Sequence, residues 1–252
     1  MEDVIQAWLR LEKHWKIEPS GKKIGKYRSY GFLRYTVGSL LKIITRIKTT
    51  GRQNIPKSSP FVIAGNHLSH VDPIVIIITS GKKIHYLAKD GHFQNFFLRH
   101  FMRLVGQIET NRDTGGKQAL SMAADVIANN KILGIFPEGT TSDGNRVLDF
   151  KSSSFSSVEN QNFIIQPIVI VYSDLNGIPI NRWLRPMIAW YGDMDLKPHL
   201  SKLVALISIK VKLFYLEPVN AQNFKNRKDL SKYLEDQIRK VYSSALSKKL
   251  AK

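Results

Sequence analysis

Residues 61–73 read FVIAGNHLSHVDP, and this stretch decides the fold. The apolar run at 61–65 ends in glycine, which is typical of a buried strand. Asp72 and Pro73 then open a second apolar run at 74–78. This predicts a helix with Asp72 as its cap and Pro73 in its first turn. His67 and Asp72 are expected to face each other across the strand-to-helix turn.

A histidine beside a carboxylate can act as a general base. The carboxylate accepts a hydrogen bond from one imidazole nitrogen and leaves the other free to take a proton from a hydroxyl. The plainer interpretation is that Asp72 is only a helix cap and His67 only a turn residue. A second signal is needed to choose between them.

That signal is at residues 131–142, which read KILGIFPEGTTS. Residues 131–136 predict another buried strand, and Glu138 follows it directly. Open α/β sheets bind ligands in a crevice at the carboxyl ends of their strands. Glu138 and the pair formed by His67 and Asp72 could therefore converge on one crevice.

Short apolar strands alternate with helical segments along the rest of the chain. This alternation predicts a single α/β domain, with a mixed, mostly parallel sheet flanked by helices on both faces. A closing helix with an apolar stripe from Leu230 to Val241 is expected to pack on the sheet. The other expected strands are 84–88, 107–110, 163–172, 187–191 and 211–216, and the other expected helices are 92–105 and 114–129.

Several other kinds of site are not expected. The chain has no cysteine, and neither His-Glu-x-x-His nor Gly-x-Ser-x-Gly occurs in it. The run Gly115-Gly116-Lys117 lacks the first glycine and the Ser or Thr of a phosphate-binding loop. His67 and His70 are not accompanied by an acidic cluster, so we expect no metal site.

The 252 residues carry a net charge of +18, which is concentrated at the two ends. Residues 1–60 have 13 Lys and Arg against four Asp and Glu, and residues 221–252 have nine against three. Basic ends of this kind can dock on anionic lipid, an acidic carrier protein, the phosphates of coenzyme A or nucleic acid.

The segment from Gly31 to Lys48 predicts an amphipathic basic helix, with Lys42 and Arg46 opposite its apolar stripe. Such a helix suits a membrane surface, and an ordinary core-packing helix is the alternative. We therefore divide the chain into a membrane-facing segment, 1–48, and a main domain, 49–252. No run approaches the ~20 apolar residues of a membrane span, and the start does not resemble a signal peptide. Peripheral or monotopic binding at the cytoplasmic side of the cell membrane is expected. The apolar stripe of the predicted amphipathic helix consists of Leu33, Val37, Leu40, Ile44 and Ile47.

Four ordered blocks resemble the glycerolipid acyltransferase family, and in particular its bacterial 1-acyl-sn-glycerol-3-phosphate acyltransferases. The first two are Asn-His-x-Ser-x-x-Asp-Pro at 66–73 and Phe-Pro-Glu-Gly-Thr-Thr-Ser at 136–142. The others are Arg112, which follows a predicted strand, and the proline-containing strand at 164–169. The resemblance covers about residues 48 to 216.

The resemblance implies that His67 is the general base and that Asp72 orients it. Arg112, Glu138, Gly139 and Thr140 would shape the acceptor site, with Arg112 meeting a phosphate. Glu109 departs from the family pattern, which usually has an aromatic or aliphatic residue there.

The implied reaction transfers a fatty acyl group from acyl-CoA or an acidic acyl carrier protein, with no further cofactor. The expected acceptor is 1-acyl-sn-glycerol 3-phosphate, giving phosphatidic acid. One alternative keeps the mechanism but uses a lyso-ornithine lipid or another lysophospholipid. Another is a basic protein that binds nucleic acid or anionic membrane without catalysis; we do not expect nucleic acid as a partner.

Overall fold

Apolar strands build a central sheet with an apolar layer on each side. A computed structural model describes residues 45–89, 107–110, 117–159, 162–192, 194, 199, 206 and 208–247. Among these residues, nine strands form one sheet, whose main path has the order β1-β8-β6-β2-β5-β3-β4. The strands are β1 (Thr45–Thr50), β2 (Val62–Gly65), β3 (Ile84–Lys89), β4 (Ile108–Thr110), β5 (Ile132–Ile135), β6 (Ile164–Leu175), β7 (Ile178–Pro179), β8 (Ile209–Tyr215) and β9 (Val219–Asn220).

The sheet is mixed and mostly parallel, as predicted. Strand β2 runs parallel to both β5 and β6, and β3 runs parallel to β5 and β4. Strand β1 runs parallel to β8, while β6 runs antiparallel to β8, β7 and β9. The carboxyl ends of β2 and β5 therefore lie side by side at one edge of the sheet.

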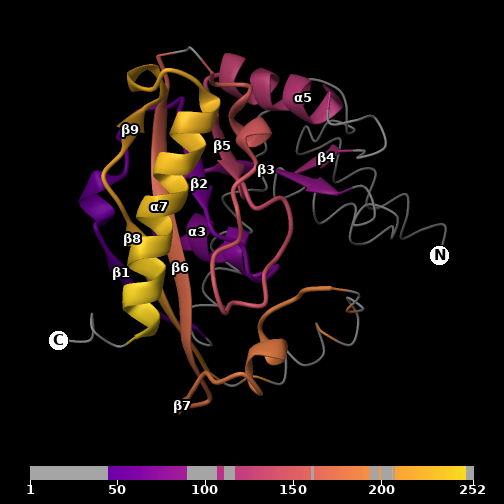
Figure 1. The fold of residues 1–252 in the computed structure, drawn as a ribbon, viewed down its shortest axis with the longest axis vertical. Coiled ribbons are helices and arrows are strands. Elements are labelled where there is room, and N and C mark those ends of the chain that lie inside the picture. The colour runs from indigo at the N-terminus through magenta and orange to yellow at the C-terminus, as the bar shows by residue number, and fades with distance from the viewer. Residues whose placement is uncertain are drawn as a thin grey trace, which may run out of the picture.

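Helices cover both faces, as predicted (Figure 1). Helix α3 (Asp72–Ser80) packs with Ile63 in the apolar layer on one face. Helices α5 (Lys117–Ala128) and α7 (Arg227–Leu246) pack with Val62 and Ala64 on the other. Successive residues of β2 therefore point to opposite layers, as the alternation of side chains in a strand requires. Short 3-10 turns complete the described elements at Arg52–Asn54, Ser152–Phe155, Arg185–Met187 and Ala221–Asn223.

Two predicted elements are wrong. The predicted helix 31–48 does not extend through residues 45–48, which belong to strand β1. Thr45, Thr49 and Thr50 are β-branched, and buried and exposed positions alternate along this strand. The predicted strand 187–191 is also absent: a 3-10 turn ends at Met187, and Ile188 and Ala189 are fully buried without joining the sheet.

Some predictions fall outside the described residues. They are the amphipathic segment before Thr45, the helix at 92–105 and the first residues of the helix at 114–129. The division of the chain at residue 48 stays a prediction, although β1 crosses that boundary and joins the sheet. Within the described ranges, no helix has both the length and the apolar character that a bilayer crossing requires.

Candidate active site

The loops that follow β2 and β5 meet at the sheet edge and bring His67 to Glu138. The backbone N–H of His67 donates to Glu138 Oε1 at 2.7 Å. The backbone N–H of Ser142 donates to the His67 carbonyl at 2.8 Å. The predicted convergence of the two sequence blocks is confirmed in the structure.

Asp72 faces His67 across the turn, as predicted. Its Oδ2 atom lies 2.9 Å from His67 Nδ1. The same oxygen accepts the backbone N–H groups of Leu68, at 2.6 Å, and Ser69, at 2.8 Å. Helix α3 begins at Asp72, but the carboxylate bonds the turn before the helix, so its predicted role as the helix cap is wrong.

The two partners differ sharply in exposure. The Asp72 side chain is fully buried, whereas 18% of the His67 side chain is exposed. A carboxylate can only accept, so in neutral His67 the proton is on Nδ1 and Nε2 carries the free lone pair. Nε2 makes no hydrogen bond to any residue that the structure describes. The pair can therefore accept a proton from a hydroxyl that reaches this edge.

Aromatic stacking holds the imidazole ring from one side. The His67 ring lies parallel to the Phe136 ring, with 3.9 Å between centroids and 8° between planes. Tyr86 stacks against Phe136, with 5.3 Å between centroids. The ring of His67 is thus fixed by both a hydrogen bond and a stack.

Asn66 ties the loop that carries His67 to strand β6. Its side-chain amide donates to the Ile170 carbonyl and accepts the Ile170 N–H, both at 2.9 Å. These paired bonds fix the position at which the chain leaves β2. The asparagine stands inside the quoted motif, but sequence reasoning gave it no role.

Tyr172 is a second residue that sequence reasoning missed. Its hydroxyl donates to Asp72 Oδ1 at 2.6 Å from the buried face of β6. Burial, reinforced by the Asp72 charge, raises the pKa of Tyr172 well above its usual value, so it stays a donor. A tyrosine in a buried aliphatic strand requires a polar partner, and this was the signal available in the sequence.

Replacing Tyr172 by phenylalanine should weaken both the site and the fold. The change leaves Asp72 Oδ1 without its donor in a buried place, which costs about 1–3 kcal/mol of stability. We expect kcat to fall about tenfold, because the carboxylate loses the one donor that holds its Oδ1 atom. Thermal melting and steady-state kinetics test this together. Lower stability with unchanged kcat would contradict a positioning role for Tyr172.

Glu138 binds the protein's own backbone with both oxygens. Besides the His67 contact, its Oε2 accepts the Leu148 N–H at 2.8 Å. The side chain is 2% exposed, and this burial raises its pKa to about 7. These contacts fit a residue that joins two loops. Its predicted contact with substrate stays a prediction.

The raised pKa of Glu138 predicts a pH-dependent stability. The Glu138 carboxyl loses its proton near pH 4.5 in the unfolded protein and near pH 7 in the folded protein. The free energy of unfolding therefore decreases as pH rises through this window. Relative to Glu138→Gln, the wild-type free energy of unfolding should fall by about 3 kcal/mol across the window. Denaturant titrations at several pH values measure it. Exposed Glu217→Gln is the control and should follow wild type.

The remaining predicted residues lie differently. Gly139 adopts a φ of 70°, which favours glycine, and Thr140 beside it is exposed. Lys151, which was not singled out in the sequence, is an exposed cation whose side chain borders Gly139. Arg112 lies outside the described residues, so its role stays a prediction. Within the described ranges, no group of three or more acidic or histidine side chains is placed to hold a metal ion.

Comparison with known proteins identifies the family. A family model described as Acyltransferase matches residues 46–171, which is half of the chain. The chain belongs to the acyltransferase family. The resemblance drawn from the four sequence blocks is therefore confirmed, and the protein is an acyltransferase.

Similar members of this family differ in the acceptor that they are named for. The lyso-ornithine lipid O-acyltransferase of Brucella abortus is 30% identical, over 80% of this chain and 77% of the relative. The corresponding enzyme of Rhizobium meliloti is also 30% identical, over 80% and 70%. A 1-acyl-sn-glycerol-3-phosphate acyltransferase of Borreliella burgdorferi is 32% identical, over 50% and 51%.

A solved structure shows the same fold. The 1-acyl-sn-glycerophosphate acyltransferase PlsC of Thermotoga maritima superposes with a TM-score of 0.64 and 22% identity. The match covers 87% of this chain and 80% of PlsC. It supports the architecture of this acyltransferase and says nothing of its acceptor.

Proposed function

We propose that this acyltransferase moves a fatty acyl group from a thioester to the free hydroxyl of a lyso-lipid. The observation that carries the proposal is the pair formed by partly exposed His67 and fully buried Asp72, 2.9 Å apart. The pair lies at the edge where strands β2 and β5 end, which is the usual ligand position in open α/β sheets.

The proposed reaction begins when His67 Nε2 removes the hydroxyl proton as the hydroxyl oxygen attacks the thioester carbonyl. A carbon–oxygen bond forms, the tetrahedral intermediate collapses, and the carbon–sulfur bond breaks. The thiolate leaves and takes the proton from His67, which restores the neutral ring. Buried Asp72 stabilises the imidazolium that exists between these steps.

We propose a lyso-ornithine lipid as the acceptor. Two relatives named for that substrate are 30% identical over 80% of this chain. Relatives named for 1-acylglycerol 3-phosphate reach 32% identity over 50% of it in Borreliella burgdorferi and 26% identity over 75% in Mycoplasma pneumoniae. Acylation of 1-acyl-sn-glycerol 3-phosphate to phosphatidic acid is the second candidate, since the Borreliella relative named for that acceptor is 32% identical to this chain. The family assignment argues against a basic binding protein without catalysis.

The donor in this proposal is acyl-CoA or acyl carrier protein, and the enzyme works peripherally at the cytoplasmic side of the cell membrane. The net charge of +18 supports contact with an acidic carrier, coenzyme A phosphates or anionic lipid. The carrier protein, coenzyme A and anionic lipid are three different partners, so the assay must present them separately.

A panel of acceptors and donors tests the proposal. Purified enzyme is given lyso-ornithine lipid, 1-acylglycerol 3-phosphate or another lysophospholipid, each with acyl-CoA or acyl carrier protein. We expect the highest kcat/KM with lyso-ornithine lipid. A preference for 1-acylglycerol 3-phosphate would favour the second candidate. If none of the acceptors is acylated with either donor, the proposed reaction is overturned.

The two candidate acceptors differ in whether they carry a phosphate that Arg112 could bind. An ornithine headgroup has no phosphate, so Arg112→Ala should raise KM mainly for the phosphate-bearing acceptor, by about tenfold. KM for the acyl donor should change little. Lys151→Ala is the matched comparison, because Lys151 is the exposed cation next to Gly139. Equal effects of Arg112→Ala on acceptor and donor would contradict the phosphate role.

A further inference from the structure

The tip of the β6–β7 hairpin and the turn after it expose large apolar side chains. We define this tip as residues 176–183. Trp183 is 74% exposed and Ile178 is 56% exposed. Of the described residues, the other exposed large apolar side chains are Tyr233, at 41%, and Leu120, at 37%. The two greatest exposures therefore occur five residues apart in one short segment.

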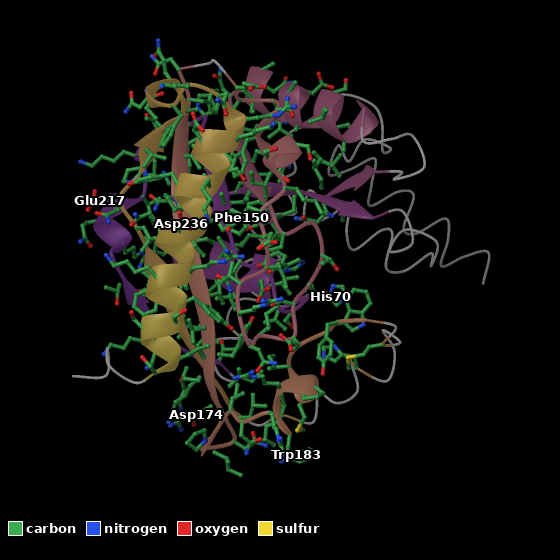
Figure 2. All side chains as sticks on the ribbon, in the orientation of Figure 1. His70, Phe150, Asp174, Trp183, Glu217 and Asp236 are labelled. Carbon is green, nitrogen blue, oxygen red and sulfur yellow. The ribbon has the colours of Figure 1, made fainter. Side chains whose placement is uncertain are left out.

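The tip projects from the same edge of the sheet that carries His67. Strand β6 is held at Ile170 by Asn66, the neighbour of His67, and it continues five residues further to Leu175. Five residues of strand span about 17 Å. Strand β7 and Trp183 accordingly lie at the lower end of the molecule, beyond the site (Figures 1 and 2).

The tip has a defined structure. The Ile180 N–H donates to the Ser173 carbonyl at 3.0 Å and closes the hairpin. Asn181 Oδ1 accepts the backbone N–H groups of Trp183, at 2.9 Å, and Leu184, at 3.1 Å. These hydrogen bonds fix the backbone of the turn that carries the Trp183 side chain.

Positive charge accompanies these apolar side chains. The Arg182 guanidinium lies 4.6 Å from the Trp183 ring centroid, and Arg185 follows in the next turn. Residues 176–185 contain no acidic residue. Asp174, just before the tip, is paired with Lys210 at 3.1 Å. Tryptophan and arginine together are typical of the interface between lipid headgroups and acyl chains.

We propose that the tip docks on the surface of a bilayer that contains anionic lipid. Ile178 and Trp183 enter the interface, and exposed Arg182 meets lipid phosphates. The inference goes beyond the proposed function, which gives no role to this segment. Docking at this edge places the lipid surface on the side of the molecule where His67 meets its acceptor.

Single-site labelling tests the docking directly, because the chain has no cysteine of its own. Ile178→Cys and Trp183→Cys are each labelled with an environment-sensitive nitrobenzoxadiazole dye and mixed with vesicles of phosphatidylglycerol and phosphatidylcholine. Leu120→Cys is the matched control. Leu120 lies on helix α5, which is at the opposite end of the sheet (Figure 1).

We expect both tip probes to brighten and shift to the blue with these vesicles, while the Leu120 probe stays unchanged. Silence at both tip positions, which a surface for a protein partner predicts, would overturn the proposal. An equal response at Leu120 would overturn it as well. The readout requires no acyl transfer, so failure here is distinct from failure of the proposed reaction.

A partition measurement gives the size of the contribution. Trp183→Ala should weaken binding to the same vesicles about five- to tenfold, since a large apolar surface no longer leaves water. Tyr233→Ala, on helix α7, is the aromatic control and should change binding less than about twofold. Equal losses in the two variants would contradict docking through the tip.

Discussion

Replacing His67 by alanine should lower kcat by about a thousandfold, within the 10²- to 10⁴-fold that general base catalysis supplies. The other described groups near the hydroxyl position offer no equivalent base, because Asp72 is fully buried and both Glu138 oxygens accept backbone N–H groups. The His67 side chain is 18% exposed and its ring stacks on Phe136, so its loss should lower the melting temperature by only a few degrees. Steady-state kinetics and a melting curve measure the two effects.

The matched control for this experiment is His70→Ala. His70 belongs to the same loop, and its ring packs against Trp190 with 4.2 Å between centroids. We expect its loss to change kcat within about fivefold, as for a residue outside the chemical step. Activity of His67→Ala close to that of wild type would contradict the role of His67 as the base.

Two substitutions of Asp72 should separate its charge from its hydrogen bonds. In Asp72→Asn, the amide oxygen can keep the three donors that now meet Oδ2. The amide nitrogen can donate to the Tyr172 hydroxyl in place of Oδ1. The fold is then nearly maintained, but the negative charge that stabilises the imidazolium is lost. We expect kcat to fall by about 10² to 10⁴, with a small change in melting temperature.

Asp72→Ala should instead destabilise the fold. It removes the acceptor of four donors in a fully buried place: His67 Nδ1, the N–H groups of Leu68 and Ser69, and the Tyr172 hydroxyl. At about 1–3 kcal/mol for each unmet group, the loss of stability should reach about 4 kcal/mol or more. Denaturant unfolding measures this loss, and equal stability of the two variants would contradict the network.

Many elements could be predicted because their signals are local. The apolar run before Gly65 and the Asp-Pro pair mark strand β2 and helix α3, and both form where expected. The stripe that begins at Leu230 marks helix α7 on the sheet. Local signals failed where contacts with distant elements decided the secondary structure. An apolar run at 187–191 fits a strand or a buried turn equally well, and β1 is a strand because β8 pairs with it.

The sequence by itself determined that His67 and Asp72 meet, because they stand five positions apart across one turn. The tertiary structure alone decided what surrounds them. Tyr172 is 100 positions from Asp72 and Glu138 is 71 positions from His67, so their contacts depend on strand register. Register follows from the packing of whole strands against both apolar layers, which no short motif encodes.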